Sequence, residues 1–495
     1  MKMSDFAEKM ESYCDMTPTE IINAIVSDEN IEKDWKNFFL ALTGHFSSTG
    51  LGPKSLLSHV ATCYGLDNDV KDLVNDSGGF PEFVYDWSDN TMSEGLDIDI
   101  FVDVLSQENI INARRAFMGY FESMNALERK WFTAIIVNET RNGAGENVTK
   151  KSLPKKYGIS TSDFNTAVKF NRLSTIIDNV TDGWGVGDLL VPSPGNYIKP
   201  QLAKTAKTLR GEYYADVKYD GIRAQFHRTE DGNVMIFNRK GDDITHRFAD
   251  LNVESWGEEF DWFILDGEII PVDEEGNVLE FKEIMPRIHG KSEAVRNRVA
   301  VKAIVFDILT YNGQDTYAFG YGTRLETLQM HFPNVNITET KLVSGEEAIR
   351  KEYTNAIKAG YEGLVLKGAN QVYEPGKRSW LKHKPALVDL DCVVMDATMG
   401  TGKRAGYYGS YELGVKIGDN LISVGSIGSG FTDEDLVSVH NYYDNNQQTT
   451  IMEVHADIIT QDREGNIGLR FPRFIRLRTD KETPTEFKSV KEMLN

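Results

Sequence analysis

The sequence predicts a multi-domain α+β protein with an all-helical N-terminal domain, a mixed α/β central domain and a C-terminal β-barrel. Three observations support this fold class. The chain has 495 residues, enough for about two to four domains of ordinary size. Helical patterns fill its first part, and short strand-like runs begin after Pro200. A hydrophobic fraction of 40% with 26% charged residues is typical of a globular protein with buried cores.

Residues 1–193 form the predicted helical domain. Its clearest helix is Ala126–Asn138, where apolar residues around Trp131 recur with the spacing of one helix face. This helix runs into the loop 141–145, RNGAG, where a glycine can end a helix in the left-handed conformation. We interpret the face that contains Trp131 as core packing.

Residues 194–385 form the predicted mixed α/β domain, which follows a stretch rich in proline and glycine. Apolar or alternating runs separated by Gly and Asp turns indicate strands, and amphipathic stretches between them indicate helices. The predicted strands are Tyr213–Lys218, Val234–Asn238, Trp262–Leu265, Ala303–Leu309 and Leu364–Lys367, and the predicted helices are Thr323–His331 and Gly345–Ala359.

Residues 386–495 contain about five short strands and one good helix start, a composition that suits a small barrel of the OB type. The helix start is the capping box Thr432–Asp435. The predicted strands are Cys392–Ala397, Tyr411–Ile417, Leu421–Val424, Met452–Ile459 and Phe474–Leu477.

The formal net charge of -21 argues against a nucleic-acid partner when it is taken alone. Its distribution weakens this argument, because basic residues collect at 199–210, 377–384 and 470–478. Three scattered cysteines are too few for a disulfide framework or a four-cysteine zinc site. The N-terminus has no signal-peptide pattern, and no apolar run approaches the roughly 20 residues of a membrane span. We therefore expect a cytoplasmic protein without a membrane partner.

The central motif is Lys218–Arg223, KYDGIR, directly after a predicted strand. The strand would direct Lys218 and Asp220 to the same side, and Gly221 would allow a sharp turn. A buried lysine near other cations has a lowered pKa, so its neutral amine can attack a phosphate. The alternative for this string alone is an exposed strand lysine beside a turn.

Further motifs follow in an order that suits phosphoryl transfer. LDGE, ending at Glu268, puts two carboxylates at a predicted turn after an apolar strand, and EGLVLK places Glu362 just before another strand. WLKHK places Lys382 and Lys384 on one strand face. Together these supply a nucleophile, carboxylates for Mg²⁺ and cations for phosphate. Separately, an Asp-Gly-Glu turn and a solvated lysine face are common, but their joint order is much rarer.

This order resembles that of the covalent nucleotidyltransferases: DNA ligases, RNA ligases and mRNA capping enzymes. The resemblance covers roughly Pro194 to Lys481. Four stretches are more specifically similar to ATP-dependent DNA ligases: Phe237–Gly241, Val305–Leu309, Gly402–Gly409 and Leu469–Lys481. The resemblance implies that the central domain is an adenylation domain, with ATP and Mg²⁺ as cofactors and nicked duplex DNA as the partner of a monomeric enzyme.

The resemblance also implies roles for matched residues. Lys218 would carry AMP, and Phe306 would stack on adenine. Asp216 stands where the family usually has a glutamate beside adenine. The other implied ATP contacts are Arg223, Arg239, Glu268, Lys382, Lys384 and Arg478. The implied metal ligands are Glu268 and Glu362, and the implied DNA contacts are Arg141, Gly143, Lys403 and Arg404.

Each assignment has a plainer alternative. Phe306 can be a core aromatic, and Lys403 with Arg404 can be an exposed turn. Arg324 is a weaker candidate, because a lone arginine at a helix start is more often solvated. Arg478 lies in the basic run 470–478, which can bind phosphate groups in general rather than those of ATP.

The predicted reaction has three phosphoryl transfers: AMP to Lys218, AMP to the 5′-phosphate at a nick, and attack by the 3′-hydroxyl with loss of AMP. A hinge near Pro385–Asp391 would let the C-terminal domain move between steps. Rival functions are an RNA ligase, a GTP-dependent capping enzyme and a non-catalytic DNA-binding scaffold. If the protein comes from a virus, we expect it to act inside the host cell.

Overall fold

The computed structural model divides into two compact units, Met1–Lys156 together with Ala386–Asn495, and Tyr157–Pro385. We describe each unit by itself. Among the residues that the structure describes, no helix is long and apolar enough to cross a membrane. The structure describes residues 1–29, 35–43, 51–66, 70–89, 93–107, 109–206, 208–290, 298–384, 388–400, 404, 406–418, 420–456, 458–461 and 465–494.

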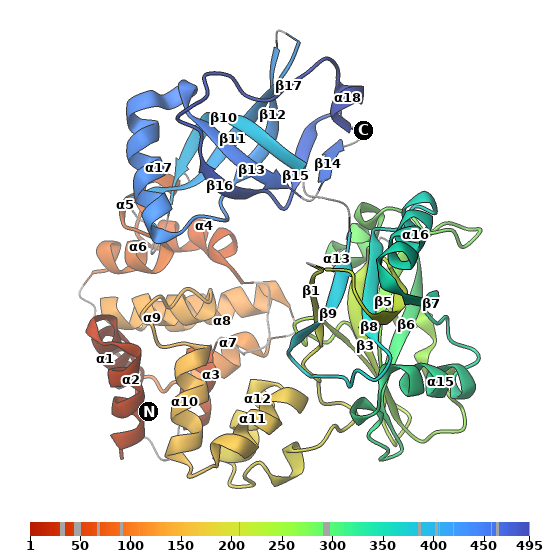
Figure 1. The fold of residues 1–495 in the computed structure, drawn as a ribbon. Helices are drawn as coiled ribbons and strands as arrows, with labels where there is room; N and C mark the ends of the chain where they lie inside the picture. The colour runs from red at the N-terminus through yellow and green to blue at the C-terminus, as the bar shows by residue number, and fades with distance from the viewer. Residues whose placement is uncertain are drawn as a thin grey trace. The chain divides into compact units, whose positions relative to one another are not determined.

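The N-terminal part of the first unit is helical, as predicted (Figure 1). Aromatic side chains form much of its core: Phe117 stacks on Phe132 at 5.0 Å between ring centroids, and Phe6 meets Phe101 edge-on at 5.3 Å. The helices are α1 (Met3–Ser12), α2 (Pro18–Ser27), α3 (Trp35–Thr43), α4 (Pro53–Cys63), α5 (Lys71–Asp76), α6 (Phe80–Trp87), α7 (Ile100–Leu105), α8 (Ile110–Glu122), α9 (Ala126–Ile136) and α10 (Glu146–Lys156).

Helix α9 confirms the predicted helix around Trp131, although it ends differently. It begins with a capping box between Asn125 and Glu128, and Trp131 is buried. The helix ends at Ile136, and Asn138 takes the left-handed conformation with φ 57°. The prediction that a glycine ends this helix was wrong, because an asparagine can adopt the same conformation at modest cost.

The C-terminal part of the first unit contains two sheets. One has the order β12-β11-β10-β13-β16, with β17 beside β11, and β14 and β15 form a separate pair. Helix α17 begins with the predicted capping box. Among the described strands no ladder closes a barrel, and the predicted Met452–Ile459 strand is two strands. The elements are β10 (Val388–Met399), β11 (Tyr408–Ile417), β12 (Asn420–Ile427), α17 (Asp433–Asn446), β13 (Ile451–Ala456), β14 (Ile458–Gln461), β15 (Ile467–Arg470), β16 (Arg473–Leu477), β17 (Glu486–Phe487) and α18 (Val490–Leu494).

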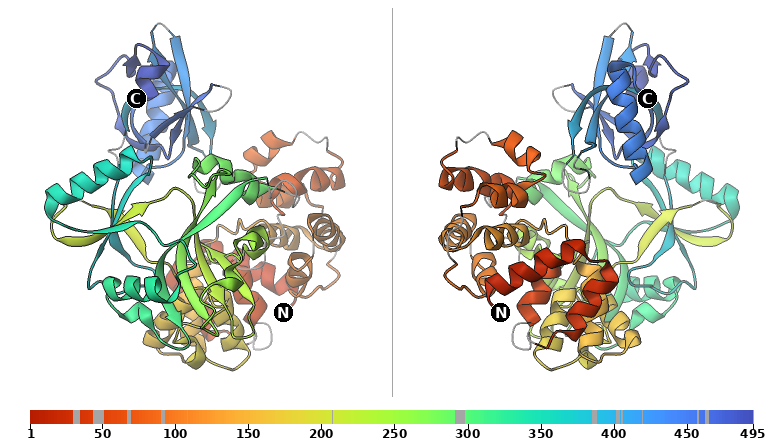
Figure 2. Two further views of the ribbon diagram at one scale, coloured as in Figure 1. Left: turned by 90° about the vertical axis from the view of Figure 1, so that its right-hand side faces the viewer. Right: turned by 90° about the vertical axis from the view of Figure 1, so that its left-hand side faces the viewer.

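The second unit contains two β-sheets with helices, as the mixed α/β prediction requires. The first sheet has the order β1-β9-β8-β2-β7, and helix α16 packs against β2, β7 and β8 (Figures 1 and 2). The second has the order β4-β3-β5-β6, with all neighbours antiparallel. The strands are β1 (Leu202–Thr205), β2 (Glu212–Lys218), β3 (Ile222–Arg228), β4 (Val234–Asn238), β5 (Phe263–Val272), β6 (Ala300–Tyr311), β7 (Thr340–Ser344), β8 (Gly363–Gly368) and β9 (Arg378–His383).

The helices of the second unit include both central helices that the sequence predicts. They are α11 (Thr161–Phe170), α12 (Leu173–Thr181), α13 (Met285–His289), α15 (Tyr321–His331) and α16 (Gly345–Lys358). One local prediction was wrong: the Asp266–Glu268 segment is not a turn but lies inside β5. The apolar residues that follow Glu268 extend this strand, which pairs with both β3 and β6.

Candidate active site

The end of β2 and the start of β8 bring Lys218 and Glu362 together. Lys218 is the last residue of β2 and lies opposite Gly363 in the β2–β8 ladder. Glu362 directly precedes β8, and its backbone N–H donates to the carbonyl oxygen of Lys218 at 3.1 Å. The two side chains form an ion pair and are 25% and 26% exposed. The predicted nucleophile and a predicted metal ligand therefore share one accessible position.

Two glycines in these motifs allow strands to approach closely. A Cβ on Gly221 would lie 2.4 Å from the carbonyl oxygen of Ile269 in β5. A Cβ on Gly363 would lie 2.3 Å from the carbonyl oxygen of His383, and Gly363 has φ 144°. Only glycine fits such positions without moving the backbone. The glycines after Asp220 and Glu362 thus let the backbone of each motif pass close to a neighbouring strand.

The ladder register places three lysines on one face of the first sheet. Lys218 pairs with Gly363, and the position of a Gly363 Cβ would be 3.1 Å from the Cα of Lys384. Lys382 pairs with Val365 two residues further along β8. Residues directly opposite in a ladder, and residues two apart along a strand, share a face. Lys382 and Lys384 therefore share one face, as the sequence predicts, and the register adds that Lys218 lies on this face too.

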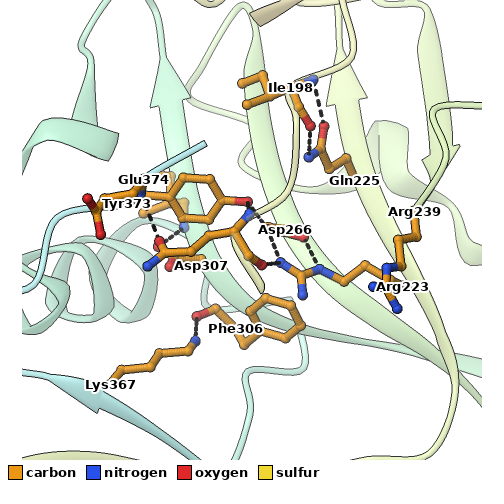
Figure 3. A network of polar contacts seen from close by, with 12 residues as sticks. Ile198, Arg223, Gln225, Arg239, Asp266, Phe306, Asp307, Lys367, Tyr373 and Glu374 are labelled. Carbon is orange, nitrogen blue, oxygen red and sulfur yellow. Dashed lines mark hydrogen bonds and ion pairs between the residues drawn. The ribbon is translucent and has the colours of Figure 1, made fainter. Parts of the chain in front are cut away.

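Asp266, in the middle of β5, orients Arg223. The Asp266 carboxylate is fully buried and accepts hydrogen bonds from Nε and Nη2 of Arg223 at 2.7 and 2.6 Å (Figure 3). The hydroxyl of Tyr373 donates to the same carboxylate at 2.5 Å. Burial acts to lower the pKa of Arg223, but the ion pair with Asp266 outweighs it and raises that pKa above its ordinary value. Arg223 is therefore a fixed cation.

Glu268 lies opposite Arg223 in the β3–β5 ladder. Burial raises the pKa of its carboxyl from 4.5 to about 7, although the charges of Arg223 and Lys218 act in the opposite direction. The carboxyl of Glu268 therefore keeps its proton to a higher pH than an ordinary glutamate. A cation bound beside it would favour the ionised form.

A β-bulge sets the position of Phe306. In the β5–β6 ladder Asp266 pairs with Asp307 and Gly267 pairs with Val305, so Phe306 has no partner between them. A bulge redirects the side chain of the extra residue and bends the strand. The ring of Phe306 lies 4.5 Å from the guanidinium of Arg223. The predicted adenine-stacking residue is thus beside a fixed cation, on a strand that is irregular at this residue.

Lys367 is a buried cation that the sequence did not single out. Its Nζ donates at 3.1 Å to the carbonyl oxygen of Phe306, which the bulge leaves without a ladder partner (Figure 3). The same Nζ pairs with Asp216 at 2.7 Å. The ammonium also lies 4.2–4.5 Å from the ring centroids of Phe306, Tyr321 and Trp380. Burial lowers the pKa of Lys367, and the charge of Asp216 acts to raise it.

Asp216, the predicted adenine contact, is buried and already accepts several hydrogen bonds. Tyr321 donates to it at 2.8 Å and Thr340 at 2.6 Å, in addition to the ion pair with Lys367. A base could bond to Asp216 only in competition with these donors. The contacts of Asp216 described here are therefore with the protein itself.

Arg239 and Arg324 have very different surroundings. Arg239 is exposed in the turn after β4, where its carbonyl oxygen accepts a hydrogen bond from Tyr197. The side chain of Arg324 is fully buried, and its Nε and Nη2 donate to both oxygens of Asp307 at 2.6 and 2.9 Å. The solvated alternative for Arg324 was therefore wrong. The sequence at the start of a helix does not indicate whether an arginine there contacts a buried aspartate.

The remaining predicted residues belong to the first unit. Arg478 donates to Asp391 at 2.8 Å and to Asp480 at 2.9 and 2.8 Å. Arg141 has φ 45° and donates to the Gly78 carbonyl oxygen at 2.9 Å and to Glu139 at 3.0 Å. Gly143 is exposed and has φ 75°. Arg404 donates to the carbonyl oxygens of Gly409 and Gly428 at 3.3 and 2.7 Å. Lys403 lies outside the described residues.

The main residues that sequence reasoning missed are Asp266, Lys367, Tyr321 and Tyr373. Asp266 and Lys367 lie inside the motifs LDGE and EGLVLK, so the motifs contain the signal although their roles depend on register. The two tyrosines have no motif. Burial raises the pKa of both hydroxyls well above its ordinary value, so each hydroxyl donates to a buried carboxylate.

Comparisons with known proteins show the family to which the chain belongs. A family model described as ATP dependent DNA ligase domain matches residues 196–384. A DNA ligase of Haloarcula marismortui is 30% identical over 75% of this chain and 72% of its own length. A DNA ligase of Methanothrix thermoacetophila is 28% identical over 94% of this chain and 92% of its own length. The fold matches the solved structure named Pmar-Lig_PreS3 with a TM-score of 0.63 at 18% identity, covering 96% of this chain and 99% of that one. The chain therefore belongs to the ATP-dependent DNA ligase family.

Proposed function

We propose that Lys218 is the residue of this DNA ligase that carries AMP, and that nicked duplex DNA is its substrate. One observation carries the proposal: Lys218 lies at an accessible strand end, paired with Glu362, on the sheet face that also presents Lys382 and Lys384. A nucleophile, a carboxylate and phosphate-binding cations are the groups that adenylyl transfer requires. ATP use follows from the family.

The ion pair between Lys218 and Glu362 suggests how the nucleophile is controlled. An ammonium paired with a carboxylate is charged, and only the neutral amine can attack phosphorus. The carboxylates of Glu362 and Glu268 are oxygen ligands of the kind that Mg²⁺ prefers, so these residues fit the metal. A Mg²⁺ ion bound there would neutralise negative charge on the triphosphate and on both glutamates. Lys218 would then be free to lose its proton and attack the α-phosphate.

The fixed groups around Phe306 support a nucleotide position beside Lys218. We assign Phe306 to stacking on adenine, and Arg223 and Arg239 to the ribose or the 5′-phosphate. Asp216 would act beside the base, either directly or through Lys367. Phe306, Arg223 and Asp216 are held by a bulge or by buried ion pairs, so little ordering is needed when the nucleotide binds.

Roles for the first unit complete the proposal. Arg478 would orient pyrophosphate, and Arg141, Gly143, Lys403 and Arg404 would contact DNA phosphates without reading sequence. The C-terminal strands would form an OB barrel. We further propose that the enzyme acts as a monomer inside the cell, which sedimentation of the purified chain and its fractionation from cells would test.

The first experiment is mass spectrometry of the full chain after incubation with Mg²⁺ and either ATP or GTP. Pyrophosphate treatment beforehand removes AMP already attached. We expect a gain of one AMP that nicked duplex DNA removes and that Lys218→Ala abolishes. Lys341→Ala is the matched control, because Lys341 is an exposed lysine on β7 of the same sheet. A gain of GMP, or no gain with either nucleotide, would contradict the proposal.

A further inference from the structure

The C-terminal end of β16 holds a cluster of ion pairs around Arg478. Its Nη1 donates to Asp391 at 2.8 Å and lies 3.5 Å from Glu453, while Nε and Nη2 donate to both oxygens of Asp480. Arg476 donates to the same Glu453 at 2.8 Å. The side chain of Arg478 is only 13% exposed. Three carboxylates therefore surround the cation that we assign to pyrophosphate.

Asp391 is the best-anchored member of this cluster. It also forms an ion pair with Lys481, so one buried carboxylate bridges two cations. Its backbone N–H donates to the Thr485 hydroxyl at 2.9 Å, and its carbonyl oxygen accepts from the Thr485 N–H at 2.7 Å. Asp391 itself lies inside β10, where it pairs with Glu453 of β13. Because its backbone is fixed on both sides, Asp391 determines where the side chains of Arg478 and Lys481 rest.

The charges within the cluster cancel. Arg476, Arg478 and Lys481 are balanced by Asp391, Glu453 and Asp480. A phosphate anion that approaches Arg478 therefore meets a formally neutral group and has to compete with carboxylates already in place. Such competition costs affinity, because hydrogen bonds between ionised groups are the strong ones.

We propose that Asp391 is a positioning residue that opposes the binding of pyrophosphate by Arg478 and Lys481. The inference rests on the proposed role of Arg478 in the adenylation step and extends that role to Lys481, which pairs with the same carboxylate. In that step the Lys218 nitrogen forms a bond to the α-phosphorus of ATP and loses its proton to solvent. The bond from the α-phosphorus to the bridging oxygen breaks, and pyrophosphate leaves with the electron pair. A carboxylate that reclaims the two cations favours release of this product.

The reverse reaction tests the inference directly. The full chain, carrying radioactive AMP on Lys218, is mixed with Mg²⁺ and increasing pyrophosphate, and the loss of label as ATP is followed. In Asp391→Asn, which keeps the shape of the side chain and removes its charge, we expect the pyrophosphate concentration for half-maximal rate to fall on the order of tenfold. The rate at saturating pyrophosphate should change little. A residue with a purely structural role would lower that rate and would not tighten pyrophosphate binding.

Two variants control for charge and for folding. Asp389→Asn removes the same charge two residues away on β10, from a side chain that is 62% exposed and lies near His455 rather than Arg478. It should leave the pyrophosphate dependence unchanged. Asp391→Glu restores the charge and should return the half-maximal concentration toward the wild-type value. Asp391→Ser also removes the charge and gives the second test if the asparagine variant does not fold.

The outcomes separate the inference from the function on which it rests. Failure of Lys218 to take up AMP refutes the proposed function. An unchanged pyrophosphate dependence in Arg478→Ala refutes the assignment of Arg478 and the inference with it. If Arg478→Ala weakens pyrophosphate binding but Asp391→Asn does not strengthen it, only the inference is wrong. The inference is also wrong if Asp391→Asn and Asp389→Asn tighten pyrophosphate binding equally, because the effect would then come from the net charge and not from the position of Asp391.

Discussion

Replacement of Glu268 by glutamine should make the second unit more stable at alkaline pH. Burial raises the pKa of this carboxyl to about 7, against 4.5 in the unfolded chain. Ionisation is therefore harder in the folded state, so stability is fullest below pH 4.5 and falls as the pH rises through about 7. The difference between the two pKa values corresponds to about 3 kcal/mol at pH 8. Glu268→Gln does not ionise and should avoid this loss.

Thermal unfolding without metal or nucleotide measures the effect. For a unit of this size about 3 kcal/mol corresponds to a rise in Tm of about 5–10 °C at pH 8. The gap between the variant and the wild type should shrink as the pH falls from 8 to 5. Glu258→Gln, at an exposed glutamate of the same unit, is the control and should show no such trend. A gap that is the same at pH 5 and pH 8 would refute the reasoning.

Two further perturbations test the packing around the site. Arg324→Met should lower the free energy of unfolding of the second unit by about 3–5 kcal/mol, because it leaves the buried Asp307 carboxylate without its cation. Urea unfolding measures this loss, and the double variant with Asp307→Asn should recover much of it. Gly363→Ala should slow AMP transfer to Lys218 by on the order of 10²-fold, because the new Cβ forces β9 away from β8. Gly360→Ala, where φ is also positive but no atom lies within 4 Å, should retain most of the activity in the same adenylation assay, and equal losses in both would contradict the steric argument.

The sequence predicted the elements well where its pattern was strong. Val234–Asn238 was predicted with its observed bounds, and the capping box at Thr432 begins a helix. Motif order was similarly informative: Lys218 and Lys382 lie on strands of one sheet, Glu362 directly precedes β8 and Lys384 directly follows β9. These predictions succeeded because hydrophobic periodicity and short motifs are local properties of the chain.

Features that depend on pairing between distant strands could not be predicted. Asp266 was expected in a turn, yet it lies mid-strand because β3 and β6 both pair with β5. The partner of Arg324 is 17 residues away and is identified only by the fold. Lys367 received no role, because its contacts come from three strands and a helix. Such contacts result from register, which a single sequence does not reveal.

The bulge at Phe306 bears on the length of β6 as well as on its composition. Side chains alternate between the two faces of a strand, yet Val305 and Ile308, three residues apart, both face the same core, because the extra residue Phe306 lies between them. Deletion of Phe306 would rejoin the ladder without changing any pair, since Val305 and Asp307 already pair with consecutive residues of β5. A deletion at Phe306 would remove the ring beside Arg223 and Lys367 and leave the core on both sides in place, whereas a deletion elsewhere in β6 would turn part of the strand over. Relatives of this enzyme should therefore tolerate a change in strand length at the bulge more readily than at any regular position of β6.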